Sequence, residues 1–422
     1  MGILTPPLRF AAAIILLLAG CDHPASGGKT KTGGERPTLH QGEDRAGQAG
    51  KGLRYAEVFS ISRDGNATRI TVHDPWQGAR RDFTYLLVPR DQASSHAARG
   101  DTQIVAVPLR RAVTLTTTNL RHLEALGVLD ALVGVGSGRY ICSPAVRQRL
   151  ADGRVRDVGD DMHLDLEALV ALRPDLLFTY VVGGSSDGGL AKLAEARLAA
   201  AIEGSYMEEN PLGRAEWIKF TAAFFGKADA ADSIFAGIDS SYRALAALAA
   251  KAARKPVVVV GAPFGGAWWV PGGRSYVARL LADAGAAYPW AGDTTRGSLN
   301  LDLEAVLAKA GGAEIWLNGG EWKDSADARA QDDRYALFRA FREGNVWNND
   351  RIRCAEGGAP GGGRDFFETG ATRPDWVLAD LIAILHPELM PGHAMRWYRR
   401  LPGGNRAGTA SSGPARADGK GG

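Results

Sequence analysis

The chain has 422 residues, of which 45% are hydrophobic and 23% charged, so it is long enough for two or three domains and has the composition of a folded protein. Its 50 Lys and Arg nearly balance its 47 Asp and Glu, which excludes the strongly basic surface of a nucleic-acid-binding protein. Glycine is abundant, with 54 residues, and its excess lies mostly in residues 1–52 and 401–422. We therefore expect disordered ends around a folded middle.

The amino terminus has the features of an export signal. The unbroken apolar run at residues 10–19 would extend ~15 Å as a helix, about half the hydrocarbon thickness of a bilayer, so it cannot span one. It suits the hydrophobic region of a secretory signal, and the sequence L-A-G-C ending at Cys21 looks like a bacterial lipobox, in which the cysteine is acylated. We expect a signal peptide at 1–20, lipidation of Cys21 and a flexible tether at 21–53. The alternative is an ordinary cleavage site, with Cys21 as a buried thiol.

Residues 54–100 are predicted to form a small antiparallel β extension. Within them, stretches with alternating apolar side chains are separated by turn-forming segments, at 55–61, 68–72 and 83–88. Residues 101–211 alternate strand-like and helix-like segments, which predicts a first lobe with a parallel α/β sheet. Its expected strands are 104–108, 112–115, 132–135 and 176–180, and its expected helices are 119–127 and 166–172.

A long helical stretch follows at 212–254. Its apolar residues recur at steps of three and four, which predicts one continuous helix or two collinear helices with a break near Gly226. Residues 255–400 return to alternating strands and helices and predict a second α/β lobe, before a disordered tail at 401–422. The expected strands of this lobe are 257–260, 314–317 and 345–347, and its expected helices are 275–284, 301–310 and 376–385.

The two predicted lobes share a short repeat. The sequence D-L-E-A begins a helix at Asp165 and again at Asp302, and a strand follows each helix. The helix dipole favours an acidic side chain in the first turn, so stabilisation of two ordinary helices is the plain interpretation of Glu167 and Glu304.

The chain resembles the bilobal substrate-binding proteins of ABC importers for iron-siderophore, haem and cobalamin-type ligands, over roughly residues 100–390. The motifs that carry the resemblance are L-E-A-L-V-A-L-R-P-D-L-L at 166–177, P-L-G-R-A-E-W-I-K-F at 211–220, W-W-V-P-G-G-R-S-Y at 268–276 and D-F-F-E-T-G-A-T-R-P-D-W at 365–376. The resemblance implies two Rossmann-like α/β lobes joined by a long rigid helix, with a ligand in the cleft between them. It also implies slight closure, delivery to a membrane permease, and pairing of Glu167 and Glu304 with arginines of that permease.

Ligand-binding residues are expected in the loops after the carboxyl ends of the strands, where open α/β lobes bind their ligands. Aromatic and arginine side chains in these loops suit a large planar or anionic chelate, through stacking and charge-assisted hydrogen bonds. The candidates are Asn119, Arg139 and Tyr140 in the first lobe and Trp268, Trp269, Arg296 and Arg364 in the second. The alternative for such aromatic residues, Trp269 included, is packing in the lobe core.

Other functional classes find less support. The chain has no G-x-x-x-x-G-K-[ST] loop, no G-x-S-x-G elbow and no H-E-x-x-H motif, so we expect neither an enzyme nor a bound cofactor. A binder of free metal ions of the related rigid-helix class stays open as the alternative, with His122 and His163 nearest the predicted cleft. His386 and His393 are expected on the surface.

Two cysteines remain after Cys21, at Cys142 and Cys354. They form no C-x-x-C pair, so a structural zinc site is poorly supported. Two free thiols and one long-range disulfide are both open. A disulfide would clamp the two lobes, but the close approach that it requires argues against it.

These features together predict a monomeric protein on the periplasmic side of the cell membrane, held by a lipid anchor. It would capture an iron chelate, haem or corrinoid and deliver it to an ABC permease in the inner membrane.

Overall fold

The computed structural model describes residues 52–93, 100–160, 163–181, 187–354 and 362–403. The predicted signal peptide, Cys21, almost all of the predicted tether and residues 404–422 of the predicted tail lie outside these ranges. Among the described residues, none of the helices is long and apolar enough to cross a membrane.

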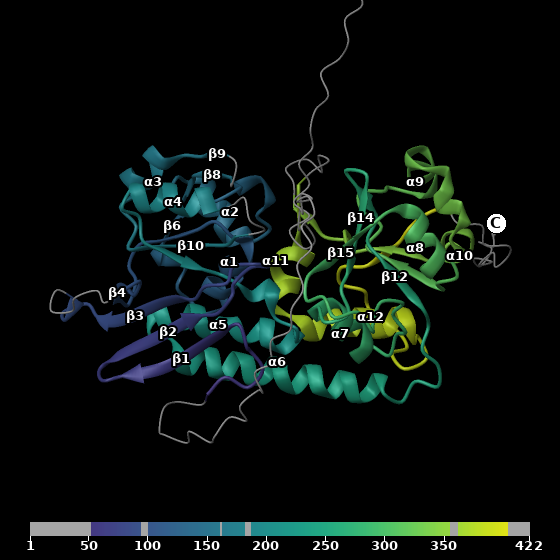
Figure 1. Cartoon of the computed structure of the whole chain (residues 1–422), viewed down its shortest axis with the longest axis horizontal. Coiled ribbons are helices and arrows are strands. Elements are labelled where there is room, and N and C mark those ends of the chain that lie inside the picture. The colour runs from purple at the N-terminus through teal and green to yellow at the C-terminus, as the bar shows by residue number, and fades with distance from the viewer. Residues whose placement is uncertain (1–51, 94–99, 161–162, 182–186, 355–361, 404–422) are drawn as a thin grey trace, which may run out of the picture.

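The chain folds into two α/β lobes side by side, as the sequence predicts (Figure 1). The first lobe contains a five-stranded parallel sheet in the order β11-β10-β5-β6-β7. Its strands are β5 (Ala112–Thr114), β6 (Leu132–Val135), β7 (Arg156–Asp157), β10 (Leu176–Thr179) and β11 (Ala200–Ile202). Its helices are α1 (Thr117–Ala125), α2 (Pro144–Ala151), α3 (Leu166–Leu172) and α4 (Asp187–Glu195), and a short hairpin joins β8 (Gly159–Asp160) to β9 (His163–Leu164).

The predicted β extension is present and is larger than expected. Strands β1 (Phe59–Asp64), β2 (Ala67–Val72) and β3 (Phe83–Pro89) pair in antiparallel order, as the alternating pattern predicts. A fourth strand, β4 (Gln103–Val107), pairs parallel with β3. The extension therefore continues past the predicted boundary at residue 100, and the first strand expected in the lobe belongs to it.

Helix α5 (Pro211–Phe225) is packed between the extension and the first lobe. The ring of Phe220 lies 5.8 Å from Phe59 of β1 and 6.5 Å from Tyr85 of β3, between ring centroids. On the lobe side, the same ring lies 6.4 Å from Phe178 of β10. The extension thus covers a face of α5 that would otherwise be exposed, and burial of each such ring stabilises the fold by ~2–3 kcal/mol.

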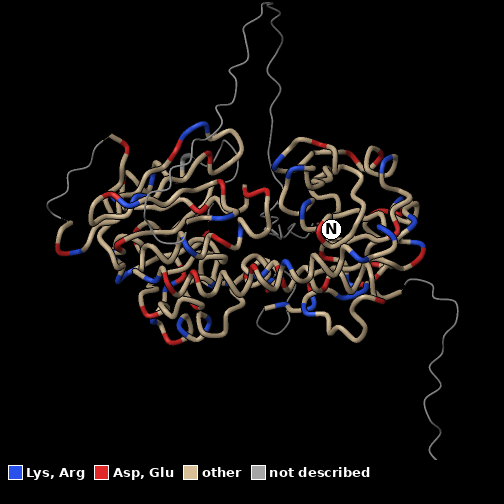
Figure 2. Tube along the Cα trace, turned by 90° about the horizontal axis from the view of Figure 1, so that it is seen from below, with Lys and Arg blue, Asp and Glu red and all other residues tan. Residues whose placement is uncertain are grey.

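The long helical stretch forms a hairpin rather than collinear helices. Gly226 ends α5 with a φ of 64°, and α6 (Ala228–Ala249) then runs back beside it. The pairing is visible in the ion pair between Lys219 of α5 and Asp232 of α6, at 3.1 Å. With 22 residues, α6 is ~33 Å long and spans from the first lobe to the second along the lower side in Figure 1, the side that faces the viewer in Figure 2. The expectation of collinear helices is therefore wrong.

The second lobe has two sheets. In the first sheet, β12, β16 and β17 are parallel and β20 is antiparallel at the edge; the second is an antiparallel ribbon of β13, β14 and β15. The strands are β12 (Val258–Val260), β13 (Pro263–Phe264), β14 (Ala267–Pro271), β15 (Ser298–Leu301), β16 (Ile315–Leu317), β17 (Val346–Asn348) and β20 (Arg399–Arg400), with a hairpin of β18 (Arg353–Cys354) and β19 (Gly363–Arg364). The helices are α7 (Tyr276–Asp283), α8 (Leu303–Ala310), α9 (Ser325–Gln331), α10 (Arg339–Arg342), α11 (Asp365–Thr372) and α12 (Pro374–Leu385).

Two expectations about the surface of this lobe are wrong. His386 is fully buried, with Nε2 3.2 Å from the carbonyl of Gly285 at the end of α7. Leu401, expected to begin the disordered tail, is buried, and its N–H donates to the carbonyl of Val346. The fold therefore continues past β20.

Candidate functional site

Loops that follow the carboxyl ends of parallel strands in the two lobes meet between the lobes. Cys142, in the segment after β6, forms a disulfide with Cys354 of β18, and their Cα atoms are 5.0 Å apart. Nearby, Gly363 of β19 lies so close to the carbonyl of Tyr140 that an added Cβ would collide with it. The lobes are thus joined covalently, and the expectation that geometry argues against this disulfide is wrong.

An ionic cluster adjoins the disulfide. The guanidinium of Arg121 on α1 lies 2.8 Å from Asp365 and 2.9 Å from Glu368, both on α11 of the other lobe. The Glu368 carboxylate also accepts hydrogen bonds from the backbone N–H groups of Cys142 at 2.6 Å and Ser143 at 2.8 Å. Burial nevertheless raises the pKa of Glu368 to about 7, while the charge of Arg121 opposes this rise.

A second set of interlobe contacts centres on Glu209, just before α5. Its carboxylate pairs with Arg274, before α7, at 2.6 Å and with Arg296, before β15. Arg296 also lies 3.9 Å from Glu57, where the chain enters the extension. One of the predicted ligand arginines is therefore engaged by protein carboxylates.

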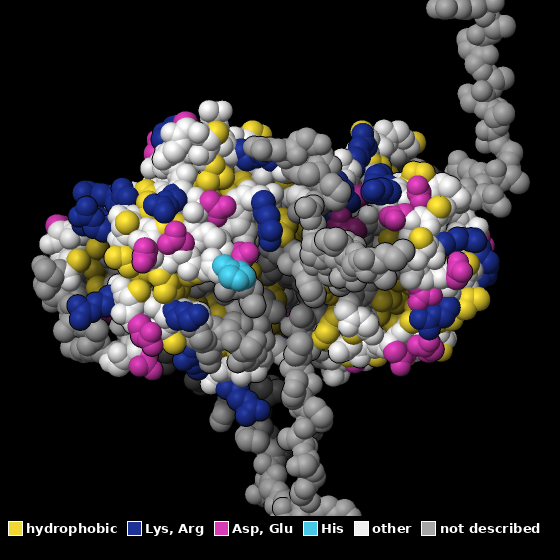
Figure 3. Space-filling model, turned by 90° about the horizontal axis from the view of Figure 1, so that it is seen from above, with side chains coloured by type: hydrophobic (Ala, Val, Ile, Leu, Met, Phe, Trp, Pro, Cys, Tyr) yellow, Lys and Arg dark blue, Asp and Glu magenta, His cyan; other side chains and the backbone are white. Residues whose placement is uncertain are grey.

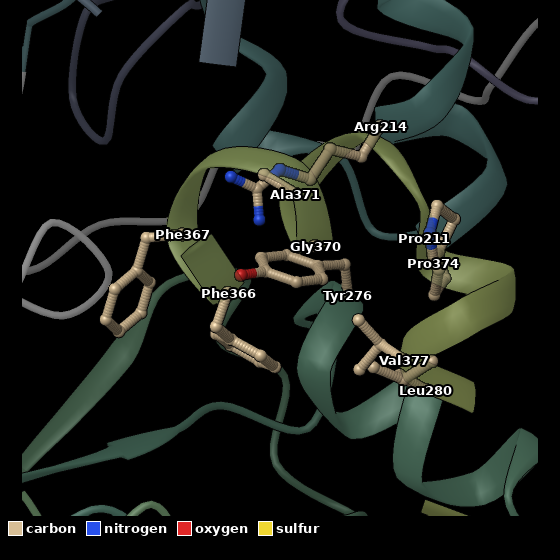
Figure 4. Close-up of a pocket in the computed structure, with 10 residues that line it drawn as sticks. All are labelled: Pro211, Arg214, Tyr276, Leu280, Phe366, Phe367, Gly370, Ala371, Pro374 and Val377. Carbon is tan, nitrogen blue, oxygen red and sulfur yellow. The ribbon is translucent and has the colours of Figure 1, made fainter. Parts of the chain in front are cut away.

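A pocket lies between these two sets of contacts, at the floor of the interface (Figure 4). Its walls come from α5, α7, α11 and the start of α12 and consist of Pro211, Arg214, Tyr276, Leu280, Phe366, Phe367, Gly370, Ala371, Pro374 and Val377. Three of the sequence motifs that carry the family resemblance, at 211–220, 268–276 and 365–376, thus converge on one place in the fold. Figure 4 shows the Arg214 guanidinium above the Tyr276 ring and the Phe366 ring below it, with the Phe367 ring farther to the left.

Two predicted ligand residues are buried in the lobe cores. The Asn119 side chain has no exposed surface and donates to the hydroxyl of Thr221 on α5, at 3.3 Å. Trp268 is also fully buried, stacked on Trp316 of β16 with 5.2 Å between ring centroids. Each side chain therefore stabilises its lobe, and its predicted position in the cleft is wrong.

The other candidates keep exposed or partly exposed surface near the interface. Arg139 is exposed and lies over the ring of Tyr140, with its guanidinium carbon 4.7 Å from the ring centroid. Arg364 lies in β19 of the disulfide hairpin; its side chain is only 9% exposed, donates to Asn349 at 2.9 Å and pairs with Glu321. Trp269 is half-buried on β14, facing away from its buried neighbour Trp268.

Sequence reasoning missed the residues that form the floor pocket. Arg214, Tyr276, Phe366 and Phe367 lie in the motifs that carry the family resemblance, but the predicted ligand contacts cover only the loops after strands. These four residues instead occupy the first turns of helices, at positions that periodicity alone assigns to packing. An arginine and several aromatic residues occur together in the motifs at 211–220, 268–276 and 365–376, and this pattern could have indicated a shared site.

The two repeat glutamates occupy equivalent places on the two lobes. Asp165 caps α3 by accepting from the N–H of Ala168, and Asp302 caps α8 by accepting from the N–H of Ala305. Glu167 and Glu304 follow in the first turn, and both are exposed. They differ in their surroundings, because Glu304 pairs with Arg334 at 2.5 Å whereas Glu167 has no ion pair within the described part of the chain.

Among the described residues, neither the surface charges nor the histidines gather into a cluster that would indicate a binding site. Viewed from above, acidic and basic side chains are interspersed over both lobes (Figure 3). His122 is fully buried with Nδ1 3.0 Å from the Thr221 hydroxyl, and His163 is exposed beside Asp160. Across the residues described here, there is no group of three or more His, Cys, Asp or Glu side chains that could hold a metal ion.

The sequence matches a known family over most of both lobes. Residues 113–350 match the family described as periplasmic binding protein. An uncharacterised lipoprotein of Methanocaldococcus jannaschii is 25% identical over 366 residues, which cover 82% of this chain and 84% of that protein. A second lipoprotein of the same organism is 25% identical over 413 residues, covering 92% of this chain and 96% of that protein.

Solved structures with the same fold include solute-binding proteins. A periplasmic haem-binding protein from Pseudomonas aeruginosa aligns with a TM-score of 0.50 and 22% identity, covering 66% of this chain and 93% of that one. A periplasmic binding protein from Veillonella parvula aligns with a TM-score of 0.50 and 13% identity, covering 78% of this chain and 98% of that one. At these identities the likeness concerns the fold.

Proposed function

Because the chain belongs to the periplasmic binding protein family, whose members are solute-binding proteins rather than enzymes, we propose that it is the extracytoplasmic solute-binding component of an ABC importer. Its solute is an iron chelate, haem or corrinoid, bound between the lobes and delivered to the permease. The observation that carries the proposal is that the loops after the parallel strands of both α/β lobes face one interface, since open α/β sheets bind ligands at that edge.

The ligand contacts are assigned to the predicted side chains near this interface that lie outside the two lobe cores. Arg139 and Tyr140 extend from the first lobe, and Arg364 lies opposite, next to the Gly363 that contacts the Tyr140 carbonyl. Trp269 and Arg296 contribute from the second lobe. An exposed guanidinium beside an aromatic face suits a planar or anionic chelate.

Docking to the permease uses Glu167 and Glu304. One exposed carboxylate on each lobe, each at a helix start, provides two separated acidic points that fix the orientation of a partner carrying arginines. An acyl group on Cys21 holds the protein at the periplasmic side of the inner membrane, in keeping with the lipoprotein names of its relatives.

The solute can be identified on the full chain purified in detergent. Native mass spectrometry of the purified protein, followed by thermal melts with ferric siderophores, haem and cobalamins, is expected to show one compound class that binds with 1:1 stoichiometry and raises the Tm. If only free divalent metal ions raised the Tm, the chelate assignment would be wrong and the protein would be a metal-ion binder.

A further inference from the structure

Arg214 places a positive charge at the floor of the interface without an ion pair to a carboxylate among the described residues. Its guanidinium carbon lies 4.6 Å from the centroid of the Tyr276 ring, and its Nε is buried without a hydrogen-bond partner. Within the described residues, Arg214 forms no ion pair.

The other arginines at the interface differ in this respect. Arg121 pairs with two carboxylates of α11, and Arg274 pairs with Glu209. Arg364 pairs with Glu321, just after β16. The absence of a counter-ion is therefore particular to Arg214 among these four side chains.

Two buried ionisable groups interact electrostatically with Arg214 without forming an ion pair with it. Burial and the Arg214 charge together lower the pKa of His122 to about 3, so this imidazole is neutral at physiological pH. Burial raises the pKa of Glu203, which favours the uncharged acid, although the Arg214 charge opposes the rise. Arg214 is half-buried and forms no ion pair with any described residue, so a bound anion would stabilise this arrangement.

The shape and walls of the pocket restrict that anion. The cavity measures about 40 Å³, which accommodates about one carboxylate group but no complete chelate. Phe366, Phe367 and Leu280 line the same pocket with apolar surface, which suits carbon atoms attached to the anion. The planar fork of a guanidinium matches the two oxygens of a carboxylate. The Tyr276 hydroxyl accepts a hydrogen bond from the Arg214 side chain and keeps its own proton to donate to an anion.

We propose that Arg214 and Tyr276 form a subsite for one carboxylate group of the transported solute, with Phe366 and Phe367 packing against the carbon atoms next to that group. This subsite rests on the proposed solute-binding function and names the chemistry that the solute presents to the floor of the cleft. The carboxylate belongs either to a free organic acid or to one arm of a metal chelate.

The test compares thermal melts and calorimetric titrations of the full chain in detergent with acetate, benzoate, citrate, ferric citrate and inorganic phosphate. At least one carboxylate is expected to raise the Tm of the wild-type protein and to bind Arg214→Gln at least tenfold more weakly. The Arg214→Lys variant keeps the charge but loses the fork and should be intermediate. The matched control is Arg279→Gln, which removes an exposed arginine of α7 that pairs with Asp283 at 3.0 Å and should leave binding unchanged.

Binding of citrate without iron assigns the subsite to a free acid, whereas binding of ferric citrate alone assigns it to a chelate arm; either supports the inference. If every carboxylate affects wild-type protein and Arg214→Gln equally, or if phosphate binds more tightly than all of them, the inference is overturned. A siderophore without carboxylates that binds both proteins equally would also overturn it, while leaving the proposed solute-binding function intact. Circular dichroism of each variant verifies that it is folded.

Discussion

Glu368 shows how a single buried carboxyl links the two lobes to pH. It is 1% exposed, lies 2.9 Å from the Arg121 guanidinium and accepts two backbone hydrogen bonds from the opposite lobe. These contacts favour the carboxylate, yet burial dominates and raises the pKa to about 7 from the ordinary 4.5. The protonated form is therefore favoured in the folded state at mildly acidic pH.

We expect the free energy of unfolding to fall as the pH rises from about 4.5 to about 7, by at most ~3 kcal/mol from this group. In this window the folded protein binds more protons than the unfolded chain, so raising the pH favours unfolding. Urea melts at half-unit pH steps should show the slope in wild-type protein and a flatter dependence in Glu368→Gln. A dependence that is equally steep in both proteins, or a stability that rises with pH across the window, would contradict the assignment.

The pair Trp268 and Trp269 shows what could not be predicted at the scale of residues. The sequence predicts both in a loop after a strand, where aromatic residues suggest ligand stacking. In the structure they lie on β14, whose register with β15 runs from Trp268 opposite Leu301 to Pro271 opposite Ser298. Alternation along the strand buries the first ring and half-exposes the second. The sequence contains both tryptophans but not the strand pairing that separates their roles.

At the scale of elements, the helix hairpin depends on one glycine. Gly226 adopts a left-handed conformation, with a φ of 64°, between α5 and α6. We expect Gly226→Ala to lower the stability by ~1 kcal/mol, because a side chain disfavours this conformation. Gly237, inside α6 with no atom near its added Cβ, is the matched control. Gly237→Ala should raise the stability by up to ~1 kcal/mol. Chemical denaturation of both variants measures whether the free energy of unfolding falls in Gly226→Ala and rises in Gly237→Ala. Equal effects would refute this role of Gly226.

The elements themselves were largely predictable. The helix expected at 166–172 is found as α3 (Leu166–Leu172), and the strand expected at 132–135 is found as β6 (Leu132–Val135), because caps and apolar runs are local features. The direction of α6 was not predictable, since apolar steps of three and four continue across Gly226 and define a face without showing that the chain reverses. The pairing of β4 with β3 likewise depends on contacts that no local pattern encodes.

At the scale of the whole molecule, the disulfide between Cys142 and Cys354 joins segments 212 residues apart and fixes the lobes to each other. Reduction should lower the stability by ~2–5 kcal/mol, because closing a long loop restricts the unfolded chain. Guanidinium melts with and without a reductant measure this difference. The variant Cys142→Ala with Cys354→Ala is the control and should melt like the reduced wild-type protein in both conditions. Identical melts of oxidised and reduced wild-type protein would show that the ionic cluster around Arg121 suffices to hold the lobes.

Docking to the permease engages both lobes at once, so its residues are best tested together. Glu167→Ala with Glu304→Ala should reduce uptake of the bound solute about tenfold or more while leaving solute affinity unchanged, because exposed carboxylates on two lobes orient the encounter without touching the cleft. Glu304 already pairs with Arg334, so Glu304→Ala alone should have the smaller effect of the two single changes. The matched control is Glu343→Ala, which removes an exposed glutamate of the second lobe that pairs with Arg339 at 2.9 Å. Uptake in cells and calorimetric affinity, measured side by side, separate docking from binding. Undiminished uptake by the double variant would leave both glutamates with helix stabilisation as their only role.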